Sequence, residues 1–155
     1  MPYSLETDMT PSKPLIRQFL ATLTLAALGT GAAHAQGSLP AGCGLQLEIK
    51  RVAAGQGPVM VAVYESEALF MKEAGVAVAA QAKGETLSLP LCNLSGEEVA
   101  VMIYQDLDRN GKLNTNFMGI PSEPYGASGE PSFGPPSWAK AKVRADGRSI
   151  SITLN

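Results

Sequence analysis

Short segments in which apolar and polar residues alternate recur along the chain from residue 45 onward. In the first of them, Leu45, Leu47 and Ile49 are apolar, while the residues between and after them are polar. A period of two residues places the apolar side chains on one face of a β-strand, whereas a helix needs a period near 3.6. The alternation therefore predicts a chain built from half-buried strands.

About seven segments are predicted to be strands, and none reads as a convincing helix. The predicted strands are residues 45–50, 58–64, 76–82, 85–91, 98–104, 140–145 and 149–154. Asp146-Gly147 separates the last two, and this dipeptide is typical of a β-hairpin turn. Residues 65–74 are expected to form one helical turn or a loop, with Leu69, Phe70 and Met71 as apolar plugs. The pattern predicts an immunoglobulin-like or transthyretin-like β-sandwich.

The alternation disappears between residues 105 and 137, in a stretch rich in glycine and proline. Phe117, Tyr125 and Phe133 lie within it, and Trp138 follows directly. A loop of this length is functional or disordered, and its aromatic content argues against disorder. We expect one long ordered loop, packed by its own rings across one end of the sandwich.

The first 35 residues have the three parts of a secretory signal peptide. Lys13 and Arg17 precede an apolar run over residues 19–31, and Ala33-His34-Ala35 supplies the small-x-small cleavage pattern. The run is too short to cross about 30 Å of hydrocarbon as a helix. We therefore expect residues 36–155 to be a single periplasmic or extracellular domain without a transmembrane segment. An uncleaved N-terminal anchor is the alternative.

Cys43 and Cys92 are the two cysteines of the chain. An even number of cysteines in an exported protein predicts a disulfide. Two free thiols are one alternative. Acylation of Cys43 is another, although Pro40 stands where a lipoprotein signal has an aliphatic residue.

Histidine and net charge restrict the function. The one histidine, His34, lies in the predicted signal peptide, so the mature chain lacks a Ser-His-Asp triad, a Cys-His pair and imidazole zinc ligands. We expect no enzymatic activity. The net charge is −2, which removing residues 1–35 does not change. We expect no nucleic-acid partner, and an envelope polysaccharide or protein instead.

The segment from residue 106 to 116 resembles a calcium-binding loop. Asp106, Asp108 and Asn110 occupy ligand positions 1, 3 and 5, and Gly111 occupies the sharp turn at position 6. The remaining candidate ligands are the Lys112 carbonyl, Asn114 and Asn116. Alternate side chains converge in such a loop, because the chain wraps around the ion.

Position 12 of this calcium-loop pattern is Phe117 rather than the usual bidentate glutamate. With two carboxylates left, the expected dissociation constant is about 10⁻⁴ to 10⁻³ M. The alternative is a plain turn, in which Asp106 and Asp108 bond to the backbone and Asn110-Gly111 adopts positive φ.

Two further functions follow from other side chains of the long loop. A carbohydrate- or peptidoglycan-binding module would use the rings of Phe117, Tyr125, Phe133 and Trp138 as a platform. A hydrolase would use paired carboxylates such as Glu123 and Glu130. Internal packing of the rings and solvation of the two glutamates are the simpler interpretations.

Three motifs together resemble one bacterial family. They are DLDRNGKLNTNFMGIP at 106–121, PYGAS at 124–128 and FGPPSW at 133–138. These resemble the family called domain of unknown function 2141, as does the strand at 59–64 followed by Glu67 and Phe70. The resemblance covers residues 44–155. It implies an exported small β-sandwich protein without an established activity, and Asn114 stands where many relatives have aspartate.

Overall fold

Seven of the eight strands in the described part of the chain begin and end close to the limits that the alternation predicts. The computed structural model describes residues 39–130 and 135–155, so the predicted signal peptide and Phe133 lie outside the described residues. Within these ranges the strands are β1 (Cys43–Lys50), β2 (Val59–Tyr64), β3 (Val76–Ala80), β4 (Thr86–Cys92), β5 (Glu98–Gln105), β6 (Tyr125–Ala127), β7 (Lys142–Arg144) and β8 (Arg148–Thr153). A four-residue helix, α1 (Trp138–Ala141), precedes β7.

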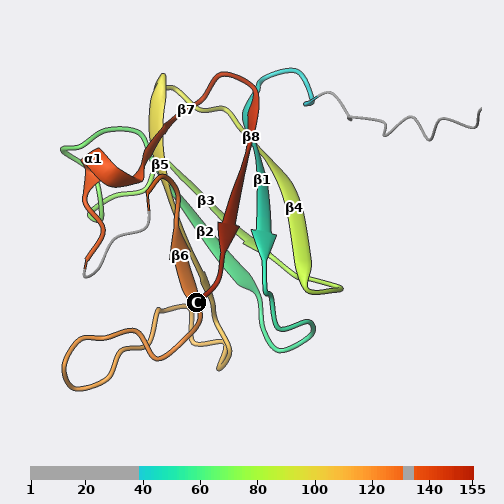
Figure 1. Ribbon diagram of the computed structural model, residues 1–155, viewed down its shortest axis with the longest axis vertical. Coiled ribbons are helices and arrows are strands. Elements are labelled where there is room, and N and C mark those ends of the chain that lie inside the picture. The colour runs from blue at the N-terminus through green and yellow to red at the C-terminus, as the bar shows by residue number, and fades with distance from the viewer. Residues whose placement is uncertain (1–38, 131–134) are drawn as a thin grey trace, which may run out of the picture. The chain divides into compact units, whose positions relative to one another are not determined.

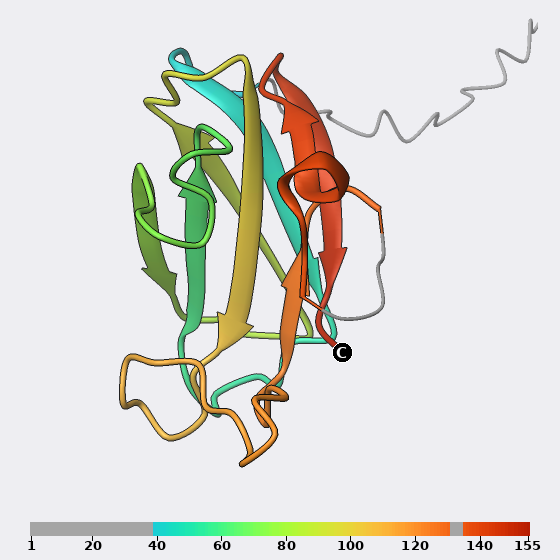
Figure 2. The ribbon, with the colours of Figure 1, turned by 90° about the vertical axis from the view of Figure 1, so that its left-hand side faces the viewer.

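The strands form two sheets (Figure 1). One has the order β4-β1-β8, and β1 and β8 run parallel, with Leu47 opposite Ile150. The other has the order β3-β2-β5-β6, and β7 also pairs with β5. The two sheets lie face to face (Figure 2), which confirms an all-β, sandwich-like fold. The choice between an immunoglobulin-like and a transthyretin-like type stays a prediction.

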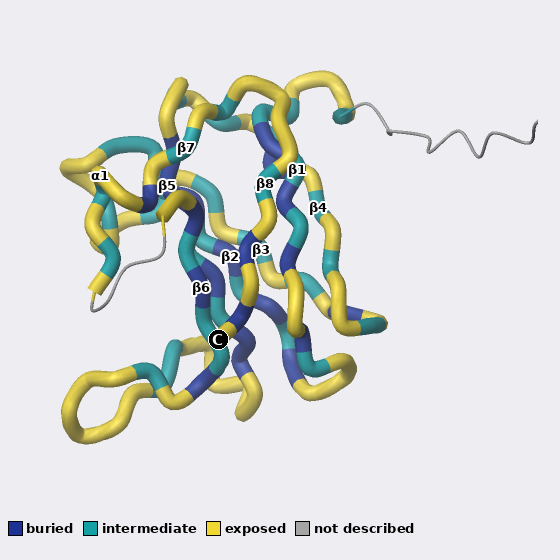
Figure 3. Tube along the Cα trace, viewed as in Figure 1, coloured by how far each residue is buried: buried dark blue, intermediate teal, exposed yellow. Residues whose placement is uncertain are grey.

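The core consists of the apolar faces that the alternation identifies. Leu45, Leu47 and Ile49 of β1 are fully buried, and every second residue of β2 and β5 points inward in the same way (Figure 3). In β8 and just after it, Ile152 and Leu154 join this cluster. Because each strand buries one face, the period of two is visible in the sequence.

The predicted hairpin at Asp146-Gly147 is wrong. Strand β7 pairs with β5 and β8 pairs with β1, so this turn carries the chain from one sheet to the other. The N–H of Gly147 donates to the carbonyl of Gly44 at 2.8 Å. The dipeptide specifies a tight local turn, but burial of the flanking apolar residues decides the pairing. The predicted strand at 140–145 is also shorter, because Lys140 and Ala141 belong to α1.

The prediction of a single long loop is also wrong, because strand β6 lies within this stretch and pairs with β5. Gly126 sits under β8, where a Cβ atom would come within 2.7 Å of Ile152 Cγ2. A three-residue strand with glycine at its centre has no readable alternation. The segment between β5 and β6, residues 106–124, projects from one end of the sandwich, and we call it the acidic loop (Figure 2).

Residues 65–74 form turns in which only one of the three predicted plugs is packed. The ring of Phe70 lies edge-on against Tyr64 at 5.4 Å and against Trp138 at 5.9 Å between centroids. Leu69 and Met71 are exposed, so their predicted role as plugs is wrong.

The predicted disulfide between Cys43 and Cys92 is present. The two residues are partners in the register of β1 and β4, 49 positions apart in sequence. Neither cysteine is left free. The bond occupies the sulfur of Cys43, which acylation would need.

Candidate metal centre

The first residue of the acidic loop is fixed by the end of β5. The buried side chain of Gln105 accepts from the N–H of Ala53 at 2.9 Å and donates to the carbonyl of Ala53 at 2.7 Å. Next to it, the N–H of Asp106 donates to the carbonyl of Pro58 at 2.9 Å. The connection between β1 and β2 thus holds Asp106 at the rim of the sandwich.

The carboxylate of Asp106 closes the turn that follows it. Its two oxygens accept from the backbone N–H groups of Asn110 at 3.0 Å and Gly111 at 2.8 Å. Gly111 has φ +77°, a conformation that glycine adopts readily. Asp106 is only 2 % exposed, so the turn encloses a carboxylate rather than presenting it to solvent.

Asp108 lies on the exposed side of the same turn. Its carboxylate accepts from the side-chain amides of Asn114 at 2.7 Å and Asn110 at 2.9 Å. The hydrogen bond from Asn114 is the main reason that the pKa of Asp108 lies below its usual value, and the bonds from Asn110 add to it. Asp108 therefore acts as an ionised acceptor.

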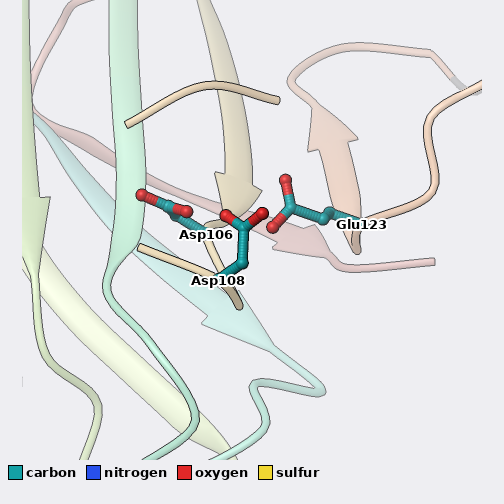
Figure 4. Close-up of side chains that lie close together, drawn as sticks. All are labelled: Asp106, Asp108 and Glu123. Carbon is teal, nitrogen blue, oxygen red and sulfur yellow. The ribbon is translucent and has the colours of Figure 1, made fainter. Parts of the chain in front are cut away.

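Glu123 completes the cluster, and the sequence interpretation did not assign it there. Its carboxylate accepts from the N–H groups of Leu107 at 2.8 Å and Asn114 at 2.9 Å, and the residue is 7 % exposed. The expectation that Glu123 is solvated is therefore wrong. Asp106, Asp108 and Glu123 each place a carboxylate oxygen within 4.8 Å of the others (Figure 4).

The phenol of Tyr104, on the outer face of β5, is affected by the charges of the same cluster. Burial is the largest cause that raises the pKa of its phenol, and the charges of Asp106 and Glu123 raise it further. The phenol of Tyr104 therefore lies near enough to Asp106 and Glu123 for their charges to act on it.

The other four predicted ligands take different places in the loop. Asn110 and Asn114 bond to each other and to Asp108, beside the carboxylates. The side-chain oxygen of Asn116 instead accepts from the N–H groups of Met118 and Ile120, farther along the loop. Lys112 is exposed, and its N–H donates to Asn110 Oδ1 at 2.8 Å.

The predicted aromatic face is not assembled from the described rings. Phe117 is 96 % exposed in the acidic loop, and Tyr125 is half-buried on β6 opposite Tyr104. Trp138 is half-buried against Phe70, near the other end of β5. Because the described rings are dispersed, they do not form the flat exposed platform that stacking on a sugar requires.

The second glutamate considered for a hydrolase lies apart from the cluster, and a nearby buried serine has a structural contact instead. Glu130 is exposed outside the acidic loop, so it does not pair with Glu123. Ser128 is buried, and its hydroxyl donates to the carbonyl of Ala141. That hydroxyl serves as a structural contact between β6 and α1.

These features define a class: a small disulfide-linked β-sandwich with a carboxylate cluster in a loop at one end. Residues 47–153 match the family model described as uncharacterized protein conserved in bacteria, DUF2141, and the chain belongs to this family. Comparisons with curated proteins and with solved structures gave no match. In the described ranges, no helix is long and apolar enough to cross a bilayer.

Proposed function

We propose that this protein is an exported, non-enzymatic binding protein of the bacterial envelope, and that calcium orders its acidic loop. The observation that carries the calcium proposal is the convergence of Asp106, Asp108 and Glu123, two of them buried. Like charges this close repel one another, and a divalent cation relieves that repulsion.

Glu123 offers a carboxylate in place of the glutamate that is missing from the calcium-loop pattern. The pattern ends in a glutamate at position 12, where this chain has Phe117. Glu123 brings a carboxylate to the same cluster from farther along the chain. With Asp106 and Asp108 it supplies three charged ligands, in a loop that already has the turn at Gly111. The bonds of Glu123 to Leu107 and Asn114 also place this third carboxylate beside the other two.

The side-chain amides next to the carboxylates suit the same ion. Asn110 and Asn114 now direct amide nitrogens at Asp108. Rotation of either amide presents its oxygen instead, and calcium takes six to eight oxygen ligands. Each carboxylate oxygen that accepts one N–H bond retains a second lone pair for the ion. The backbone bonds of Asp106 and Glu123 are therefore compatible with metal binding.

The convergent carboxylates also raise the hydrolase alternative. Hydrolytic pairs lie about 5–9.5 Å apart, and one member must be a proton donor with a raised pKa. Asp108 has a lowered pKa instead. The second acid considered for such a pair, Glu130, lies outside the loop. We therefore favour ion binding over hydrolysis.

The calcium proposal is tested by thermal unfolding in excess EDTA and in millimolar calcium or magnesium. A site with a dissociation constant near 10⁻⁴ M gains about 2.7 kcal/mol at hundredfold excess calcium, a shift on the order of 10 °C. We expect this shift with calcium and not with magnesium. Terbium luminescence sensitised by Tyr104 gives an independent reading of ion binding beside that ring.

Two variants separate the site from general electrostatics. Asp108→Asn removes an exposed ligand charge and should abolish most of the calcium shift, while the melting temperature in EDTA changes little. Glu73→Gln removes an exposed carboxylate of the β2–β3 connection and should leave the shift intact. An unchanged melting temperature in calcium for the parent chain would refute the proposal.

Export is tested on the full chain expressed in bacteria. We expect the protein in the envelope fraction, with the mass of a chain that begins at Gln36. A full-length mass in that fraction would favour the uncleaved anchor. Recovery from the cytosol with two alkylatable thiols would overturn export.

A further inference from the structure

Residues 117–120 of the acidic loop carry three large apolar side chains, and we call this segment the apolar tip. Phe117 is 96 % exposed, Met118 is 64 % exposed and Ile120 is 51 % exposed. Figure 3 shows this segment as an exposed projection away from the two sheets. Isolated apolar residues are common on protein surfaces, but three on one projection mark an interaction site.

Three of the four backbone N–H groups of the apolar tip are paired with Asn116. Asn116 Oδ1 accepts from the N–H groups of Met118 at 2.9 Å and Ile120 at 3.0 Å, and the Asn116 carbonyl accepts from Gly119 at 2.9 Å. The next residue, Pro121, has no N–H. Unpaired N–H groups are costly in hydrocarbon, and these donors are paired before the tip meets any partner.

The base of the tip is joined directly to the candidate metal centre. Thr115 and Pro121 form a β-bridge, and the N–H of Ser122 donates to the carbonyl of Asn114 at 2.8 Å. The N–H of Asn114 in turn donates to Glu123. An ion that restrains Glu123 and Asn114 therefore also restrains the two chain segments at the base of the apolar tip.

Charges on the acidic loop favour an anionic surface when an ion is bound. Arg109 and Lys112 are exposed in the same loop, and the three clustered carboxylates oppose them. A bound divalent cation offsets two of those three negative charges. The same loop then carries two exposed cations and three exposed apolar side chains, with most of its negative charge offset.

We propose that the apolar tip inserts into the interfacial layer of an anionic phospholipid membrane. The side chains of Phe117, Met118 and Ile120 offer no hydrogen bonds to a glycan. The paired N–H groups of the tip suit lipid tails, and the exposed cations of the same loop suit lipid phosphates. The promotion of insertion by calcium rests on the proposed function. The preference for anionic lipid rests on it as well, because the three carboxylates outweigh the two cations when no ion is bound. Insertion of the apolar tip itself does not.

Flotation with vesicles tests the inference. The probe is vesicles of equal parts phosphatidylcholine and phosphatidylglycerol, compared with phosphatidylcholine alone, each in calcium and in EDTA. The full chain is used, and mass spectrometry confirms that every variant has the same N-terminus. We expect the parent protein to float with the anionic vesicles in calcium.

Paired variants assign the contact. F117S/M118S should lower partitioning about tenfold or more, because the apolar contact is lost. L69S/M71S removes two exposed apolar side chains of the β2–β3 connection, at the opposite end of β2 and β5 by their register, and should leave partitioning unchanged. R109Q/K112Q should lower partitioning about fivefold for each charge.

Depth of insertion is read with Phe117→Trp and brominated lipid. We expect quenching of the introduced indole, with the half-buried Trp138 of the parent protein as the unquenched reference. Equal flotation of the parent and F117S/M118S would overturn the inference, because the bound surface would then lie elsewhere. Self-association of the protein through the apolar tip, with the tip withdrawn from lipid, would assign the tip to a second copy. That result would also overturn the inference.

The same data keep the two proposals apart. Calcium binding in the melt without flotation refutes insertion and leaves the metal site standing. Flotation that depends on Phe117 and Met118 but is equal in calcium and EDTA supports insertion and refutes its control by the ion. Asp108→Asn distinguishes an ion in the loop from calcium that bridges lipid and protein directly, since only the former loses calcium-dependent flotation.

Discussion

Gly57 lies so close to the backbone of Asp106 that a Cβ atom at Gly57 would stand 2.0 Å from the Asp106 carbonyl oxygen. The neighbouring Pro58 carbonyl accepts the N–H of Asp106. A residue of the β1–β2 connection therefore sets the position of the first candidate ligand. The approach requires glycine, because any side chain there would meet backbone rather than a movable group.

Gly57→Ala should therefore destabilise the protein and displace Asp106. We expect a loss of at least about 2 kcal/mol in urea unfolding and a weaker calcium response in the melt. Gly55→Ala is the matched control, because Gly55 also has positive φ (+75°) but no atom within 4 Å of its Cβ position. It should cost about 1 kcal/mol of backbone strain and leave the calcium response intact. Equal effects of the two variants would contradict the close approach.

Ser128 joins three segments through one hydroxyl. Its oxygen accepts from the N–H of Val101 at 2.8 Å, and its O–H donates to the carbonyl of Ala141, in the gap between β6 and β7 along β5. Ser128→Ala leaves both backbone groups buried without this partner, at about 1–3 kcal/mol for each group.

Thermal or urea unfolding measures the effect of Ser128→Ala. Ser137→Ala is the control, since Ser137 precedes α1 without a side-chain cap bond, and it should be nearly neutral. A neutral Ser128→Ala would show that water replaces the hydroxyl.

The strands that the sequence predicts well are those with one face in the core. β1, β2 and β5 place Val, Leu or Ile at every second position, so the sequence identifies which of their residues are buried. Strand β6 does not have this alternating pattern. Its central residue, Gly126, is required by contact with Ile152 from the other sheet, and a local pattern holds no information about that contact.

The same division applies to the candidate site. Asp106, Asp108 and Asn110 are recognisable because the turn that gathers them is local in sequence. Glu123 is brought back by the bridge between Thr115 and Pro121, which the sequence interpretation did not foresee. The pairing of β7 with β5 was missed for the same reason, since Asp146-Gly147 specifies a turn and not a partner strand.

The disulfide should contribute much of the stability of this small domain. It closes a loop of 49 positions between Cys43 and Cys92, for which chain entropy gives at most about 4 kcal/mol. We expect C43S/C92S to unfold at correspondingly lower urea. Reductant should destabilise the parent protein and have no effect on the double variant. An effect on both would assign the loss to the reductant rather than to the bond.

Tyr104 supplies a spectroscopic test of the carboxylate cluster. Burial, and then the charges of Asp106 and Glu123, raise the pKa of its phenol. A group with a raised pKa in the folded state contributes stability that is present below its unfolded pKa, about 10. That contribution is lost as the pH rises through the folded pKa. The stability of the parent protein should therefore fall more steeply above about pH 10 than that of Tyr104→Phe.

Bound calcium should lower the pKa of Tyr104 toward its ordinary value, because the ion offsets the charges of Asp106 and Glu123. Ultraviolet titration of the phenolate, with Tyr104→Phe subtracted, measures this pKa in carbonate-free buffer with calcium or EDTA. The Asp108→Asn variant should lose most of the calcium effect, while Glu73→Gln retains it. An identical titration of Tyr104 with and without calcium, at concentrations that raise the melting temperature, would place the ion away from these carboxylates.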